Sequence, residues 1–151
     1  MNNPWTDTRR LAAPQLRRQV MKITHENWNK GKWPNFSPSE LMCKCGCGDL
    51  QMEDDFLDSL QGIRDEVGPM AITSGYRCPK HPIEAAKTSP GSHAQGVGAD
   101  VGTEGEQAFL IVAHSISYGM EGIGISQREG QPRFIHLDQL IAEYRPRIFG
   151  Y

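Results

Sequence analysis

The stretch TSPGSHAQGVGADVG, residues 88–102, constrains the fold more than any other part of the chain. It places His93 and Asp100 seven residues apart with Gly96 and Gly98 between them, which disfavours a long helix. As an extended strand it would hold the two side chains about 23 Å apart. They can meet only if the chain reverses, and glycine permits this because it enters left-handed backbone conformations at little steric cost. We therefore expect a tight loop that brings an imidazole and a carboxylate together.

A histidine and an aspartate held together can bind a metal ion. Zinc accepts imidazole nitrogen and carboxylate oxygen, and a catalytic zinc keeps three protein ligands and one open position. The segment RFIHLD, residues 133–138, offers the third ligand. On a strand, His136 and Asp138 face one side while Ile135 and Leu137 face the other. From the residues alone, a metal site and a purely structural role for the histidines both stay open.

The remaining segments predict helices and strands in mixed order. We expect helices over 7–29, from a capping box at 37–40, over 53–68 and over 104–120. We expect strands over 70–76, 122–126 and 133–138, the last two joined as a hairpin through the turn-rich QREGQP. This order predicts an α+β fold with a small, mainly antiparallel sheet and flanking helices.

Length and charge limit the organisation and the partners. The 151 residues suit one globular unit, and a net charge of -2 argues against a general nucleic-acid binder. Residues 1–34 carry seven Lys/Arg and two acids, whereas residues 35–151 carry nine and sixteen. We expect a basic N-terminal appendage or helix over 1–34 and a monomeric domain over 35–151. We also expect no membrane span and, without a secretion signal, synthesis in the cytoplasm.

Three of the four cysteines crowd into the segment CKCGCG as Cys43, Cys45 and Cys47, and Cys78 stands apart. Their one-residue spacing is unlike the spacing of common zinc knuckles. Three interpretations stay open: a second, structural zinc on all four cysteines, a disulfide from Cys78 to one of the other three, or free thiols.

The order SGYRCPKHP, SHAQGVGAD and FIHLD resembles the zinc peptidases of the M15 family. It is most similar to the branch of small D-alanyl-D-alanine carboxypeptidase-like proteins of bacteriophages and bacteria, from FSPSEL to the closing IFGY. The resemblance implies the hedgehog/DD-peptidase-like fold and zinc ligands at His93, Asp100 and His136. It also implies that Arg77 holds a substrate carboxylate or carbonyl, although a structural salt bridge is the alternative for this residue.

The chain departs from the family pattern at several positions. Related proteins often carry a serine two positions before the first ligand, where this chain has Gly91 followed by Ser92, and alanine is usual at Gly98. We expect Ser92 to contact the substrate. Well-characterised relatives carry an acidic base three residues before the last histidine, where Arg133 stands here.

The base must therefore lie elsewhere. Asp138 is the first candidate, with orientation of His136 as its alternative role, and Glu129 in the preceding turn is a weaker candidate.

The resemblance implies zinc-dependent hydrolysis of an amide bond in bacterial peptidoglycan. A small peptidase of this kind without a secretion signal suits a phage endolysin, made in the host cytoplasm and acting on the cell wall. The loss of the acid at Arg133 keeps a second interpretation open: a zinc-containing, catalytically inactive module that binds the wall.

Overall fold

The computed structural model describes residues 19–151, so most of the helix predicted over 7–29 lies outside the described residues. The central element is a five-stranded sheet in the order β3-β4-β6-β5-β7. Its strands are β3 (Ala71–Ser74), β4 (Gly98–Gly102), β5 (Gly122–Ser126), β6 (Phe134–Asp138) and β7 (Arg147–Gly150). Neighbouring strands pair antiparallel except β5 and β7, which pair parallel. The predicted α+β fold and the β5–β6 hairpin are confirmed.

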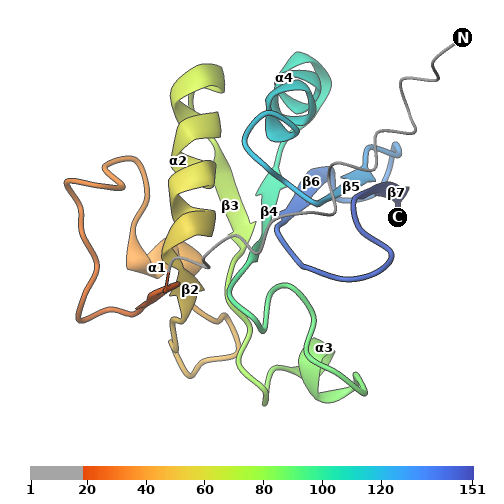
Figure 1. Cartoon of the computed structure of the whole chain (residues 1–151). Helices are drawn as coiled ribbons and strands as arrows, with labels where there is room; N and C mark the ends of the chain where they lie inside the picture. Colours follow the sequence, from red (N-terminus) through yellow and green to blue (C-terminus); the bar gives the residue numbers. More distant parts are fainter. Residues whose placement is uncertain (1–18) are drawn as a thin grey trace, which may run out of the picture.

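Two helices, α2 (Asp54–Val67) and α4 (Gly105–Ser115), lie side by side over one face of this sheet (Figure 1). Helix α2 forms where the sequence predicts it, and it ends at Gly68, whose φ of 84° favours glycine. The shorter helices are α1 (Pro38–Leu41), which begins at the second residue of the predicted capping box at 37–40, and α3 (Pro82–Ala85). No helix in the described part of the chain is long and apolar enough to cross a membrane.

The sheet separates an apolar core from a polar face. Ala99, Val101, Ile135 and Leu137 are buried in the hydrophobic core, together with residues of α2 and α4. Because side chains alternate along a strand, the residues between them project from the opposite face. The alternation predicted for RFIHLD is thereby confirmed.

The helix predicted over 7–29 is wrong in its described part, residues 19–29. This segment contains strand β1 (Lys22–Ile23), which pairs antiparallel with β2 (Met52–Glu53) in a separate two-stranded sheet. The side chain of Ile23 is 2% exposed and belongs to the core. Burial of this residue and pairing with a distant strand override the local helical pattern.

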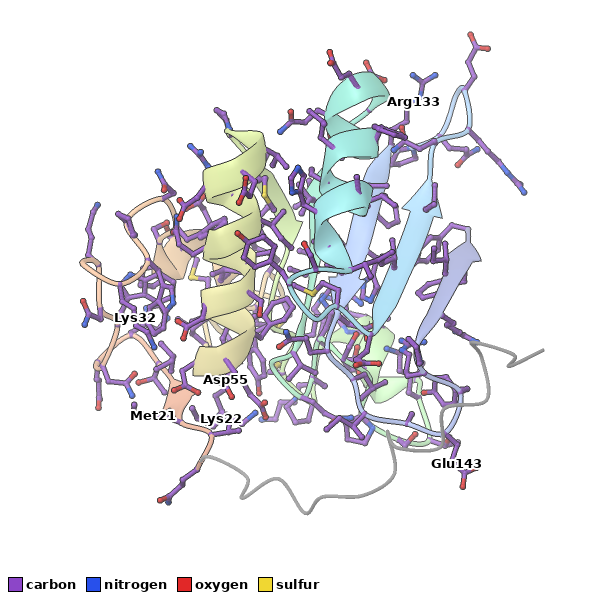
Figure 2. The ribbon with its side chains drawn as sticks, turned by 45° about the horizontal axis from the view of Figure 1, so that its top comes forward. Met21, Lys22, Lys32, Asp55, Arg133 and Glu143 are labelled. Carbon is purple, nitrogen blue, oxygen red and sulfur yellow. The ribbon has the colours of Figure 1, made fainter. Side chains whose placement is uncertain are left out.

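The segment after residue 18 is held to the start of α2 (Figure 2). The backbone N–H of Met21 donates to Asp54 at 3.1 Å, and Lys22 forms an ion pair with Glu53 at 3.1 Å. Trp33 is also buried in the core, and its Nε1 donates to Asp58 at 2.9 Å. The proposed domain boundary after residue 34 stays a prediction.

Two further differences from the sequence predictions lie in the second half of the chain. The helix predicted over 104–120 ends at Ser115, and since Phe109 is 71% exposed, α4 buries only one of its faces. The strand β7 was not predicted, and it extends the sheet beyond the β5–β6 hairpin.

Candidate functional site

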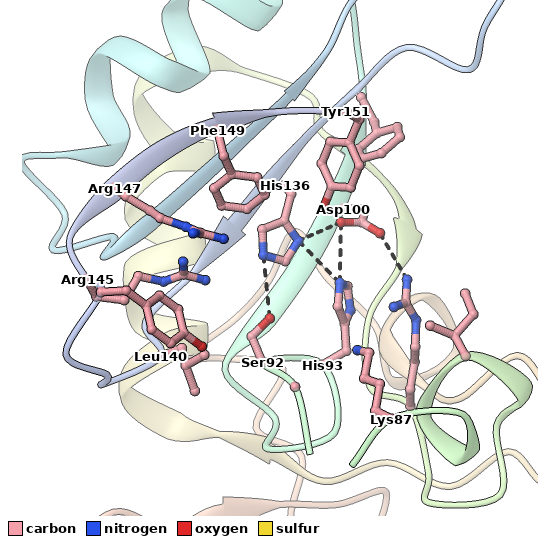
Figure 3. A pocket seen from close by; sticks show the side chains of 15 residues that line it. Lys87, Ser92, His93, Asp100, His136, Leu140, Arg145, Arg147, Phe149 and Tyr151 are labelled. Atoms are coloured by element: carbon pink, nitrogen blue, oxygen red, sulfur yellow. Dashed lines mark hydrogen bonds and ion pairs between the residues drawn. The ribbon is translucent and has the colours of Figure 1, made fainter. Parts of the chain in front are cut away.

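The three side chains predicted as metal ligands meet on the polar face of the sheet (Figure 3). Asp100 and His136 are direct cross-strand partners on β4 and β6, and Oδ1 of Asp100 lies 2.8 Å from Nδ1 of His136. Nε2 of His93 lies 3.3 Å from each of these two atoms. All three residues are buried. One oxygen and two nitrogens therefore point at a common centre.

The glycine-rich loop before β4 delivers His93 to this centre. The backbone N–H of Val97 donates to the carbonyl of Ser92 at 3.0 Å, and Gly96 has a φ of 75°. A Cβ atom at Gly96 would overlap the carbonyl oxygen of Gln51, so the close approach requires glycine as much as the backbone angle does. The chain reversal predicted between His93 and Asp100 is confirmed.

The remaining ring nitrogens of the two histidines each have an acceptor. Nδ1 of His93 lies 2.7 Å from the carbonyl oxygen of Gly75, and Nε2 of His136 lies 2.8 Å from Oδ2 of Asp138. A neutral imidazole that donates its N–H outward presents a lone pair on its other nitrogen. Both histidines are thus oriented to offer a lone pair to the common centre.

The spacing of the three atoms fits a zinc ion. In a tetrahedral site with metal–ligand bonds of about 2.0–2.1 Å, neighbouring ligand atoms lie about 3.3–3.4 Å apart. The three distances here are 2.8, 3.3 and 3.3 Å. Two imidazoles and one carboxylate are also a donor set that zinc accepts. The chain can therefore hold a metal ion here.

Arg77 joins this centre through Asp100. Its Nη2 donates to Oδ2 of Asp100 at 3.2 Å, and its Nε donates to Ser74 at 3.1 Å. Burial alone would raise the pKa of the Asp100 carboxyl, but its close polar contacts with His136 and His93 hold it well below its usual range. The salt bridge expected as the alternative for Arg77 is present. An open cavity lies directly above this centre, and Arg77 is one of the residues that line it. Binding of a substrate group by Arg77 therefore stays a prediction.

Asp138 lies behind His136, on the nitrogen that faces away from Asp100. It is fully buried, and Oδ2 accepts from His136 and from Nη2 of Arg145 at 2.6 Å. Oδ1 accepts from the N–H of Leu140 at 3.0 Å and from Nε of Arg145 at 3.2 Å. Burial opposes its ionisation, but these hydrogen bonds lower the pKa of Asp138. The contacts favour the orienting role of Asp138 over the role of a base.

Glycines on the neighbouring strands make room for this arrangement. Gly98 and Gly122 are the cross-strand partners of Asp138 on its two sides. A Cβ at Gly122 would lie 2.6 Å from Cγ of Asp138, and one at Gly98 would lie 2.6 Å from Oγ of Ser92. The glycine that replaces the family's usual alanine thus leaves the space in which Ser92 lies. Ser92 lines the cavity, and its Oγ is 3.5 Å from Nε2 of His136.

Arg133 and Glu129 lie outside the cavity. Arg133 forms an ion pair with Glu104 near the start of α4 (Figure 2), and Glu129 is exposed in the β5–β6 turn. Within the part of the chain that the structure describes, Asp100 is the only carboxylate that lines the cavity. Glu129 is therefore not placed to act as a base.

The cavity above the centre has a volume of about 670 Å³ and is rich in positive charge and aromatic rings. Its cationic side chains are Arg77, Lys87, Arg145 and Arg147, and its aromatic ones are Phe134, Tyr144, Phe149 and Tyr151. The guanidinium of Arg147 lies 4.8 Å from the ring centre of Phe149 (Figure 3). Tyr144, Arg145, Arg147, Phe149 and Tyr151 form one wall of the cavity, which comes from β7 and the residues on either side of it.

The sequence predictions missed these wall residues. In the segment RPRIFGY, the residues Arg145, Arg147, Phe149 and Tyr151 alternate with others, and all four line the cavity. This period of two was the available signal for a strand with a functional face. The proline within the segment weakens the strand pattern.

Comparisons with known proteins agree with the geometry. The family model described as Peptidase M15 matches residues 34–138, which contain all three converging side chains. A search of curated proteins found no match. Since the family model covers more than half of the chain, and its matched part folds as the α+β domain described above, this protein belongs to the M15 peptidase family.

Proposed function

We propose that the chain is a zinc-dependent peptidase that cleaves an amide bond in the stem peptides or cross-links of bacterial peptidoglycan. The observation that supports this proposal is the convergence of His93, Asp100 and His136 beneath a cationic cavity. A zinc ion held by these three side chains would supply Lewis-acid chemistry and activate water near neutral pH.

The surrounding residues orient the ligands. Asp138 and the carbonyl of Gly75 fix the two imidazoles through their outer nitrogens. Arg77 holds one oxygen of Asp100, which leaves the other oxygen directed at the centre. Such partners of metal ligands are typically worth 10–100-fold in metal affinity or activity.

The cationic wall would bind the substrate. Stem peptides of peptidoglycan carry free carboxylates, and guanidinium groups pair with carboxylates through parallel hydrogen bonds. Arg77 lies next to the centre, while Arg147 and Lys87 are exposed at the cavity wall. We infer that Arg77 and Ser92 contact the peptide near the scissile bond and that Arg147 and Lys87 bind a more distant carboxylate.

We further infer that the protein is a monomeric phage endolysin, made in the host cytoplasm and acting on the wall. The motif resemblance to the phage branch supports this biological role. The excess of positive charge on residues 1–34 would favour binding to anionic wall polymers.

One observation favours the alternative of a wall-binding module without catalysis. A peptidase commonly uses a carboxylate near the metal to move a proton, and the described part of the cavity offers only Asp100, which is directed at the centre. This alternative predicts bound zinc and bound wall fragments without turnover.

Digestion of purified sacculi, followed by mass spectrometry of the soluble products, tests the proposal. The parent should release muropeptides whose masses identify the cleaved bond. His136→Ala should lose the zinc ion of the cavity and all release, whereas His114→Ala, the same change on α4 away from the site, should retain both. Zinc binding with no release from any sacculus would instead support the binding module. Full zinc content in His136→Ala would contradict the ligand assignment.

A further inference from the structure

The four cysteines come together away from the cavity. The sulfur of Cys45 lies 3.4 Å from that of Cys43, 3.3 Å from that of Cys47 and 3.6 Å from that of Cys78. All four sulfurs lie within 4.8 Å of one another. Tetrahedral zinc thiolates, with bonds of about 2.3 Å, place neighbouring sulfurs about 3.8 Å apart. A disulfide would need one pair at about 2.0 Å.

Two glycines curve the CKCGCG segment around this point. Gly46 has a φ of 101° and Gly48 a φ of 70°, and both values lie in the region that other residues rarely adopt. The N–H of Cys43 donates to the carbonyl of Asp49 at 2.8 Å, which closes the loop. The left-handed glycines let cysteines spaced one residue apart turn their sulfurs to the same side. The unusual spacing is therefore compatible with a shared ion.

Two of the sulfurs also accept hydrogen bonds from the backbone. The N–H of Cys78 donates to Cys43 at 3.3 Å, and that of Asp49 donates to Cys47 at 3.4 Å. Hydrogen bonds of this kind favour the charged form of an acid. They would stabilise the negative charge that four thiolates bring to one metal ion.

We propose that Cys43, Cys45, Cys47 and Cys78 together bind one zinc ion, separate from the site in the cavity. Each thiol gives up its proton on binding, so four protons are released and the site carries a net charge of -2. Cys43 and Cys78 are buried, whereas Cys45 and Cys47 are exposed. The ion can thus enter from solvent and cross-link a surface loop to the protein interior.

This zinc site would hold in place the segment that carries Arg77 and the carbonyl group that orients His93. Cys78 follows Arg77 directly, and Gly75, whose carbonyl orients His93, lies three residues before it. A Cβ at Gly75 would lie 2.7 Å from Cα of Leu41, so this segment packs closely against the chain that leads into the cysteine loop. Binding of the ion would hold the two segments together. The proposal does not depend on the chemistry proposed for the cavity.

Metal analysis of the purified full chain tests the proposal. The parent should hold two zinc ions and the double variant Cys45→Ser/Cys47→Ser one, because the variant lacks two of the four thiolates. Both changed side chains are exposed, so the variant should still fold. Lys44→Ser, an exposed change in the same loop, should keep two. After replacement of zinc by cobalt, the thiolate-to-cobalt charge-transfer band should be present in the parent and in His136→Ala but absent from the double variant.

A second measurement needs no variant. In the native parent, alkylation of the four thiols should be slow, and a chelator should make all four reactive. Rapid alkylation without chelator would overturn the proposal, as would an intact mass two hydrogens below that of the reduced chain, or equal metal content in parent and double variant. Loss of metal in the double variant but not in His136→Ala would sustain the cysteine site and contradict the proposed ligands in the cavity.

Discussion

We predict that Asp138 orients His136 as a zinc ligand, and the variant Asp138→Asn tests this prediction. Asp138→Asn keeps the size of the side chain and one acceptor oxygen, but it removes the charge that faces Nε2 of His136 at 2.8 Å. It also leaves the guanidinium of Arg145 without its anionic partner. The imidazole should then be a weaker and less well oriented ligand.

The expected magnitude follows from the position of Asp138 behind the ligand. Loss of such a partner typically lowers metal affinity by about 10–100-fold. Turnover should therefore fall at limiting zinc and recover when zinc is added in excess. A base would behave differently, since its removal lowers turnover by about 10²–10⁴-fold while zinc stays bound.

The assay is a zinc titration of hydrolysis, with metal content measured in parallel. Asp58→Asn serves as the matched control. Asp58 accepts a hydrogen bond from Trp33 on the far side of the core, and the amide oxygen of the substituted side chain can still accept it. The control should match the parent in both measurements. A large loss of turnover in Asp138→Asn at full zinc occupancy would refute the orienting role and restore Asp138 as the base.

Three further predictions concern the cavity wall, the glycine neighbours and acid stability. Arg147→Ala should raise KM about 3–10-fold with little change in kcat on a carboxylate-bearing muropeptide, and the effect should vanish on the amidated peptide. Gly122→Ala should lower stability by about 1–3 kcal/mol in thermal unfolding, since its Cβ would lie 2.6 Å from Cγ of Asp138; an unchanged Tm would contradict the packing. Burial raises the pKa of Glu84, but the hydrogen bond from Lys87 helps to bring it below its ordinary value, so the unfolded chain binds more protons in acid. The stability that this carboxylate contributes is present above its ordinary pKa and is lost as the pH falls, so the parent should lose more stability than Glu84→Gln between about pH 6 and pH 3.

The convergence of His93, Asp100 and His136 could be predicted because the local sequence favours it. His93 and Asp100 are separated by glycines that can do little else than turn the chain, and His136 lies in a strand whose alternation is evident. Helix α2 was equally predictable, since Phe56, Leu60 and Ile63 mark one face and all three are fully buried. In each case the local pattern and the tertiary environment favour the same structure.

The predictions failed where distant contacts decide the outcome. Lys22–Ile23 became a strand because Met52–Glu53 offers a partner 30 residues away in sequence and Ile23 reaches the core. Strand β7 pairs with β5, from which it is separated in sequence by the whole of β6. Most of its side chains are exposed, so its sequence has no run of buried apolar residues that would predict a strand. The contact of Arg145 with Asp138 could likewise not be inferred from spacing within FIHLD, because Arg145 lies on a separate segment.

The sharing of Asp138 between His136 and Arg145 has a thermodynamic consequence. One buried carboxylate orders both a ligand of the proposed zinc and a residue of the cavity wall, so the free energies of the two binding events should be coupled. By linkage, any factor by which bound zinc tightens the binding of an anionic peptide must equal the factor by which the peptide tightens zinc. A product analogue that carries a carboxylate should therefore slow the loss of zinc to a chelator. Asp138→Asn should lower this cooperativity by a larger factor than it lowers the affinity for zinc alone or for the analogue alone.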